Sequence, residues 1–157
     1  MTVYTSGPIK VGPLKDRTES LSRVDVVFYG IDHSGPSFEA RIFLDNPGAD
    51  ASTPMDADHG FAGTFHIFGH GGCFGDEGHC EVPTGPVSAF DRRPPHQLTP
   101  TIKRVIATAA VKRVLQLSDQ GTMSVTVVPI VKESPLAKPE FAEDVLSISD
   151  VAILAYR

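Results

Sequence analysis

The sequence predicts an all-β protein, a two-sheet β-sandwich of the jelly-roll or immunoglobulin-like type with one short helix. The first observation behind this prediction is the 14 glycines and 13 prolines among 157 residues, which indicate frequent turns rather than long helices. The second is a series of at least six short apolar or alternating runs between those turns. Because the chain is about the size of one domain, we expect residues 1–157 to share one core, with residues 1–22 as an N-terminal arm or edge strand.

Alternating apolar residues predict the strands in the first half of the chain. Residues 37–44 place every second side chain on one apolar face, which is typical of a half-buried strand: Phe38, Ala40, Ile42 and Leu44. Residues 61–68 alternate in the same way, with Phe61, Gly63, Phe65 and Ile67 on one face and Ala62, Thr64, His66 and Phe68 on the other. Before them, residues 24–29 are predicted to form a strand that Gly30 ends, and residues 45–59 a turn-rich loop.

The second half of the chain is predicted to hold three more strands and the helix. Residues 102–107 form a short strand that runs into Thr108, a residue type that caps helices, so the helix should cover residues 109–117. We expect this helix to close one end of the sheet, with three apolar residues on the buried face: Val111, Val114 and Leu115. Residues 122–131 are the strongest β-branched run, and residues 145–156 supply the last strand.

Charge and hydropathy exclude several classes of function. With a net charge of −5 and scattered lysines and arginines, the chain has no basic stripe for binding phosphates, so we expect no nucleic-acid partner. No run of eighteen apolar residues is present, so we expect no membrane span. The N-terminus lacks the charged start and apolar run of a secretory signal, which favours a cytoplasmic location. The sequence is compatible with a homo-oligomer.

The segment from His66 to Cys80 carries the densest chemistry. It contains three imidazoles, two thiols and two carboxylates within fifteen residues. Its glycines allow the backbone to turn tightly enough for several of these groups to converge. Imidazole with thiolate favours zinc or copper over magnesium or calcium, which prefer oxygen ligands. We therefore predict a transition-metal site built from His66, His70, Cys73, His79 and Cys80.

Other interpretations of these residues remain open. Cys73 and Cys80 could form a disulfide under oxidising conditions, whereas in a reducing compartment a nearby pair binds metal or stays reduced. His66 could be an ordinary half-buried histidine on a strand face. Asp76 and Glu77 could be solvated turn residues.

Three further histidines lie outside this segment. His33 sits in a turn, where polar side chains commonly bond the backbone, and it becomes a further metal ligand if the turn meets the segment that follows His66. We expect His59 and His96 to be surface residues. No Gly-x-Ser-x-Gly elbow, phosphate-binding glycine loop or His-Glu-x-x-His helix is present, so standard hydrolase, kinase and protease functions lack the residues they need.

Several stretches resemble the C-terminal domain of polyphenol oxidases and tyrosinases. Short β motifs carry part of the resemblance: Phe61–Phe68, the strand and helix over residues 102–115, Ser124–Pro129 and Leu146–Ile148. Two longer stretches resemble the version found in bacterial tyrosinase-like proteins: His-Ser-Gly-Pro-Ser-Phe-Glu at residues 33–39 and Gly-His-Gly-Gly-Cys-Phe-Gly-Asp-Glu-Gly-His-Cys at residues 69–80. The resemblance covers most of the chain after Val24.

The resemblance implies a β-sandwich related to the third domain of haemocyanins, which covers the dicopper site of an attached catalytic domain. It implies copper as the metal, with zinc as the alternative. In that family the covering domain often presents an aromatic side chain to the catalytic pocket, and Phe74 is the corresponding candidate here. This chain lacks the helical bundle whose six histidines hold two coppers, so we expect it not to hydroxylate phenols on its own.

Three functions follow from these observations. The first is a non-catalytic domain that shields or assists a copper oxidase partner, either a tyrosinase-like catalytic domain or a separate protein, and that binds a transition metal through the His/Cys segment. The second is a stand-alone copper- or zinc-dependent metalloenzyme in which Asp76 or Glu77 carries protons. The third is a ligand- or protein-binding sandwich with a disulfide-stapled loop.

Overall fold

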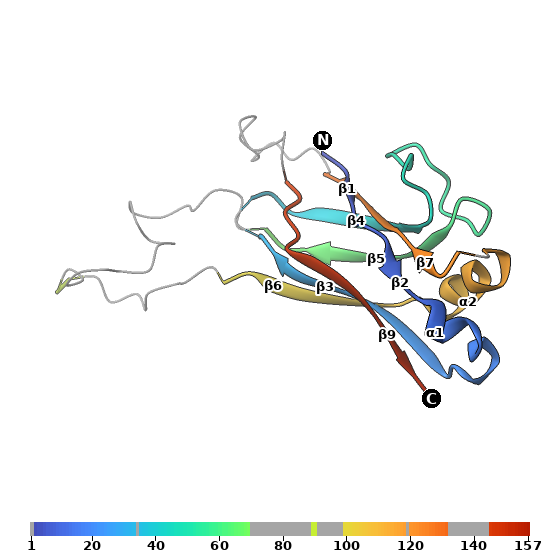
Figure 1. The fold of residues 1–157 in the computed structure, drawn as a ribbon. Coiled ribbons are helices and arrows are strands. Elements are labelled where there is room, and N and C mark those ends of the chain that lie inside the picture. The colour runs from blue at the N-terminus through green and yellow to red at the C-terminus, as the bar shows by residue number, and fades with distance from the viewer. Residues whose placement is uncertain (1, 34, 70–88, 91–98, 119, 132–144) are drawn as a thin grey trace.

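Two antiparallel sheets packed face to face form the body of the molecule (Figure 1). The computed structural model describes residues 2–33, 35–69, 89–90, 99–118, 120–131 and 145–157. One sheet has four strands, in the order β1 (Tyr4–Thr5), β8 (Val125–Ile130), β4 (Phe38–Leu44) and β5 (Phe61–Ile67). The other has three strands, in the order β6 (Thr101–Ile106), β3 (Arg23–Ile31) and β9 (Asp150–Tyr156). The all-β sandwich predicted from the sequence is confirmed.

The core lies between the two sheets and is built from alternate residues of each strand. Side chains of β3 and β4 that point inward have almost no exposed surface: Val24, Val26, Phe28, Phe38, Ala40 and Ile42. The ring of Phe28 meets the ring of Phe65 from the opposite sheet, with centroids 5.0 Å apart. Fully burying a side chain of this size contributes about 1.5–3 kcal/mol, so this contact between the layers is a main stabilising feature of the sandwich.

A β-bulge in β5 changes the face on which Phe61 lies. Ile42 pairs with Gly63, but the next residue of β4, Phe43, pairs with Phe61, so Ala62 has no partner across the strand. Gly63 adopts φ +138°, a backbone conformation open to glycine. Because one extra residue reverses the alternation, Phe61 packs with Phe43 on the outer face and not with Phe65 in the core. The prediction that Phe61 shares a face with Phe65 is wrong for this reason.

A second irregularity lets β3 continue past the glycine that was expected to end it. The register of β3 against β6 shifts between Phe28 and Ile31, and Gly30 adopts φ +63°. The shift brings Ile31 into the core, where its side chain is fully buried. A β-carbon on Gly30 would overlap the side chain of Ser149, which occupies that space. Gly30 therefore makes a bulge within β3 and does not terminate it.

Helix α2 (Thr108–Leu117) closes one end of the sandwich beside the short helix α1 (Gly12–Lys15) (Figure 1). Its buried residues are Ala110, Val111 and Leu115, with Val114 packed against the core. Thr108 is not the N-cap, because the helix already begins at this residue and its hydroxyl accepts a hydrogen bond of 2.9 Å from the Val24 amide. The hydroxyl thus joins the helix to β3. No helix within the described residues has the length and apolar character needed to span a bilayer.

The N-terminal residues pack onto the sandwich through two short strand pairings. Besides β1, which pairs with β8, this part of the chain contains β2 (Ile9–Lys10), α1 and the 3-10 helix η1 (Thr18–Ser20). Strand β2 pairs with β7 (Thr122–Met123), and this two-stranded sheet is separate from the four-stranded sheet that contains β8. The predicted single strand over residues 122–131 is therefore two strands, divided at Ser124, whose amide donates to the Asp45 carboxylate at 2.7 Å.

The last strand is shorter than predicted. Strand β9 begins at Asp150, whereas the predicted strand began at residue 145. Val145 and Leu146 are buried all the same and join the core ahead of the strand. The apolar residues at the start of this segment therefore mark burial and not strand pairing.

Candidate functional site

Two of the six predicted metal ligands, His33 and His66, lie in the part of the chain that the structure describes. The other four, His70, Cys73, His79 and Cys80, lie outside the described residues, as do Phe74, Asp76 and Glu77. Among the described residues, no three His, Cys, Asp or Glu side chains form a group that could hold a metal ion. The predicted metal site therefore stays a prediction, and the described residues show only what surrounds the segment that would carry it.

His33 lies just beyond the end of β3 and is oriented by the backbone of a distant residue. Its Nε2 atom is 2.8 Å from the carbonyl oxygen of Thr99. Since a carbonyl oxygen can only accept, Nε2 carries the hydrogen, and in the neutral ring Nδ1 is then the nitrogen with the lone pair. Histidines that bind metals commonly donate their other ring N–H to a backbone carbonyl in this way. The tautomer of His33 is thus compatible with ligation through Nδ1.

The turn that contains His33 lies directly against the end of β5. The Gly69 amide donates a hydrogen bond of 3.0 Å to the Ser37 hydroxyl. A β-carbon on Gly69 would overlap the backbone of Gly35 and Pro36, so the two segments approach as closely as glycine allows. His33 becomes a ligand candidate if its turn meets the start of the His/Cys segment. This condition is met at Gly69.

These contacts place two distant points of the chain at the same turn. The chain leaves β5 at Gly69, beside Ser37, and Thr99 accepts the His33 hydrogen bond just before β6 begins. The side chain of Phe68, immediately before Gly69, is 88% exposed. The turn at residues 33–37 is therefore adjacent to both ends of the segment between Gly69 and Thr99.

His66 lies on the outer face of the four-stranded sheet and is 71% exposed. Its Nε2 atom is 3.6 Å from an oxygen of Glu39, the residue opposite it on β4. The other oxygen of Glu39 accepts a hydrogen bond of 2.9 Å from Arg41. His66 is thus an exposed member of a short charged row and not a half-buried histidine, and exposed pairs of this kind contribute little to stability.

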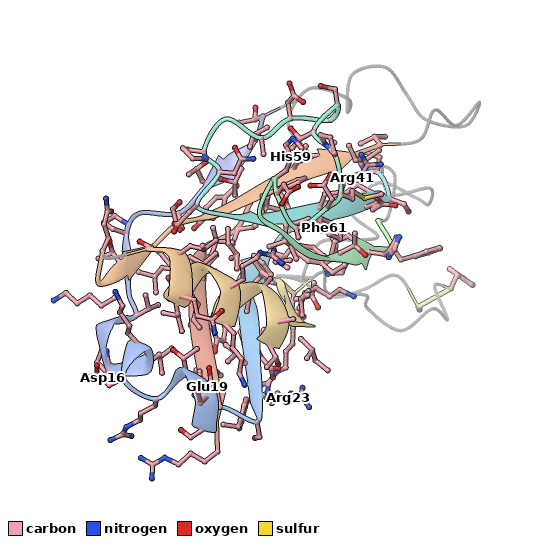
Figure 2. All side chains as sticks on the ribbon, turned by 90° about the vertical axis from the view of Figure 1, so that its right-hand side faces the viewer. Asp16, Glu19, Arg23, Arg41, His59 and Phe61 are labelled. Carbon is pink, nitrogen blue, oxygen red and sulfur yellow. The ribbon has the colours of Figure 1, made fainter. Side chains whose placement is uncertain are left out.

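The loop between β4 and β5 covers part of this outer face. It packs over Phe43 and Phe61, whose rings meet edge to face at 5.7 Å between centroids. Within it, the His59 ring nitrogen Nδ1 is 2.6 Å from the Asp56 carboxylate, and this hydrogen bond lowers the pKa of Asp56. His59 is exposed, as predicted. Figure 2 shows Arg41, Phe61 and His59 on the side of the molecule away from Arg23.

No pattern in the sequence singled out Asp25, the most completely enclosed charge among the described residues. It lies on the outer face of the three-stranded sheet, yet its side chain has no exposed surface. Arg23 donates to both carboxylate oxygens, at 2.7 and 3.0 Å, and Arg104 donates at 3.2 Å. The hydrogen bond from Arg23, assisted by the charges of Arg23 and Arg104, lowers the pKa of Asp25. The signal in the sequence was the spacing of Arg23 and Asp25, two residues apart on β3, whereas Arg104 of β6 reaches Asp25 only through the β3–β6 register.

Comparison with solved structures shows the same fold in part of a larger protein. A recombinantly expressed latent aurone synthase, a polyphenol oxidase, matches with a TM-score of 0.54 and 14% identity. The latent aurone synthase from its natural source matches with a TM-score of 0.52 and the same identity. Both matches cover 98% of this chain but only 24% of the polyphenol oxidase chain.

Comparison of the sequence with known families and curated proteins finds no relative. No family model matches the chain, and no curated protein matches it. At 14% identity the likeness to the polyphenol oxidases is one of fold. The chain spans about a quarter of their length.

Proposed function

We propose that this chain is a tyrosinase-associated domain of the C-terminal type that shields or assists a copper oxidase partner. The observation that carries the proposal is the fold match, which takes in nearly the whole of this chain and about a quarter of a latent polyphenol oxidase. The partner, a tyrosinase-like catalytic domain or a separate protein, supplies the oxidation chemistry. The sandwich supplies a rigid support for the segment that reaches the partner.

The contacts at the turn of residues 33–37 support a role for one end of the sandwich. The Gly69 amide and the Thr99 carbonyl are both held there, by Ser37 and by His33. A segment with both ends anchored on a packed scaffold loses less conformational entropy when it binds than a free one does. We therefore propose that the segment between these anchors carries Phe74 to the pocket of the partner.

The same segment is proposed to bind copper, with zinc as the alternative. The residues that would hold the metal are His33, His66, His70, Cys73, His79 and Cys80. The described residues support this set most directly at His33, whose Nε2–H bonds the Thr99 carbonyl and whose turn contacts Gly69. The exposed ring of His66, three residues before Gly69, supports it less directly.

The shielding function is tested by adding the chain to a tyrosinase whose own C-terminal domain has been removed. We expect the initial rate of catechol oxidation to fall as the chain is added, and the chain alone to show no oxidation after loading with copper. Phe74→Ala should weaken the inhibition by roughly tenfold or more, as removal of a buried aromatic anchor does. Leu117→Ala removes an exposed apolar side chain of α2, a helix joined to the start of β3, and serves as the control, with inhibition unchanged. Turnover by the copper-loaded chain alone would contradict the proposal.

Metal binding is tested separately by elemental analysis of untagged protein together with a thiol count. We expect close to one copper or zinc per chain and cysteines that react with a thiol reagent only after chelation. His33→Ala should lower the metal content, whereas His59→Ala, which removes an exposed histidine of another loop, should not. A chain with no metal and no reactive thiols would point to a disulfide instead.

A further inference from the structure

The outer face of the three-stranded sheet presents apolar side chains around the enclosed Asp25. The register places Asp25 opposite Ile106 and Leu154, and Val27 opposite Arg104 and Ala152, so these residues share the face that points away from the core. Three exposed apolar side chains lie on it: Ile102 at 58%, Ile106 at 61% and Tyr156 at 38%. We call this surface the β3 face. No described helix or strand covers it (Figure 1).

Charge on the β3 face is divided between its two ends. Arg23 lies at the start of β3, paired with Tyr156. Asp150 lies at the other end of the same strand pair, opposite Tyr29. Arg23 and Arg104 together carry two positive charges against the single charge of Asp25, which leaves that end positive, whereas Asp150 makes the far end negative. Along β3, Arg23 and the position opposite Asp150 are about six residues apart, which is about 20 Å along a strand.

The charges on the β3 face are self-complementary when the β3 faces of two copies pack together with their strands in opposite directions. A two-fold axis that lies in the plane of contact, perpendicular to the strands, sets β3 of one copy over β3 of the other in the opposite direction. It brings the Asp150 end of each copy against the Arg23 end of the other, as a two-fold interface requires. The same-direction arrangement would place arginine ends against each other, which like charges disfavour.

We propose that the β3 face is the interface of a homodimer with this end-to-end two-fold symmetry. The apolar side chains beside Asp25, those of Ile106 and Leu154, pack face to face in the aligned manner of β-sandwich layers. Two equivalent ion pairs, Asp150 of one copy with Arg23 of the other, set the orientation at the two ends. This proposal does not rest on the shielding function, which uses the turn of residues 33–37 beyond the end of β3.

The test measures the mass of the full 157-residue chain by sedimentation and light scattering over increasing concentration. We expect the mass to rise from 16.8 kDa to twice that value. Ile106→Glu should keep the chain monomeric, because it places a carboxylate among the apolar side chains of the contact. Leu117→Glu, at an 80% exposed position of α2, is the matched control and should dimerise normally. A wild-type chain that stays monomeric, or a dimer that Ile106→Glu leaves intact, would overturn the proposal.

A charge exchange tests the orientation. Asp150→Arg and Arg23→Glu should each raise the dimer dissociation constant by roughly tenfold, because each breaks both symmetric ion pairs. Mixed together, the two variants should form a heterodimer, since the two substituted positions then carry opposite charges and face each other at one end. At the other end the native Arg23 of one variant faces the native Asp150 of the other.

Asp58→Arg, an exposed reversal in another loop, is the control that leaves association unchanged. If Arg23→Glu does not fold because it loses its bonds to Asp25, Asp150→Arg and Ile106→Glu still decide. An undiminished affinity of Ile106→Glu refutes the interface, and an undiminished affinity of Asp150→Arg refutes its end-to-end orientation.

Discussion

Gly63→Ala should destabilise the sandwich through two separable effects. Gly63 adopts φ +138°, and an alanine held there carries backbone strain of about 1–3 kcal/mol. Its β-carbon would lie 2.8 Å from Cγ1 of Val105 on the opposite sheet, and relieving such an overlap costs about 1–3 kcal/mol more. For a sum of about 4 kcal/mol, the melting temperature of a domain of this size falls by about 8–16 °C.

The double variant Gly63→Ala/Val105→Ala separates the two effects. Val105→Ala alone removes two largely buried methyl groups and should cost about 2 kcal/mol. Because it also removes the atom that the new β-carbon would meet, the double variant should be more stable than the sum of the single changes by about 1–3 kcal/mol. Urea denaturation measures all four proteins. Additive effects would show that the two residues do not meet, and a Gly63→Ala change below about 0.5 kcal/mol would refute the bulge.

Three further changes test other features of the sandwich. Phe43→Ala should lower the free energy of unfolding by about 3–5 kcal/mol, since its ring is fully buried under the loop of residues 45–60. Faster hydrogen exchange at Ala49 would show that the variant loosens this loop, and unchanged exchange would contradict the packing of the loop on Phe43. Thr108→Val should lower the free energy of unfolding by about 1–3 kcal/mol because it leaves the Val24 amide without its acceptor. Thr108→Ser, which keeps the hydroxyl, should be as stable as the wild type in thermal melts. Equal losses in the two variants would contradict the hydrogen bond. Asp25 has a pKa in the folded protein below its ordinary 3.8, so the stability it contributes is present above pH 3.8 and is lost as the pH falls through the lower folded pKa. In acid titrations followed by circular dichroism, Asp25→Asn should remove this part of the loss of stability. An acid profile identical to that of the wild type would refute the lowered pKa of Asp25.

The candidate site could be predicted from the sequence in composition but not in arrangement. The density of imidazole and thiol groups between His66 and Cys80 was visible as a pattern, because ligand chemistry depends on residue type. The contact of the His33 turn with Gly69, and the bond from His33 to Thr99, join residues far apart in the chain through pairing that no local pattern encodes. Asp25 was missed because Arg104, its second arginine, meets it only through the register of β3 against β6.

By itself, the sequence determined the sandwich and most of its strands. The alternation in β4 and in the second half of β5, and the apolar face of α2, depend on the local geometry of strands and helices, which repeats every two or about 3.6 residues. Only the tertiary structure decided where that alternation is broken. The bulges at Gly30 and Ala62, the hydroxyl of Thr108 that bonds Val24, and the division at Ser124 each depend on a partner far away in the chain. Local preference selects an element, but a distant neighbour that fills a space or satisfies a hydrogen bond sets its register and its ends.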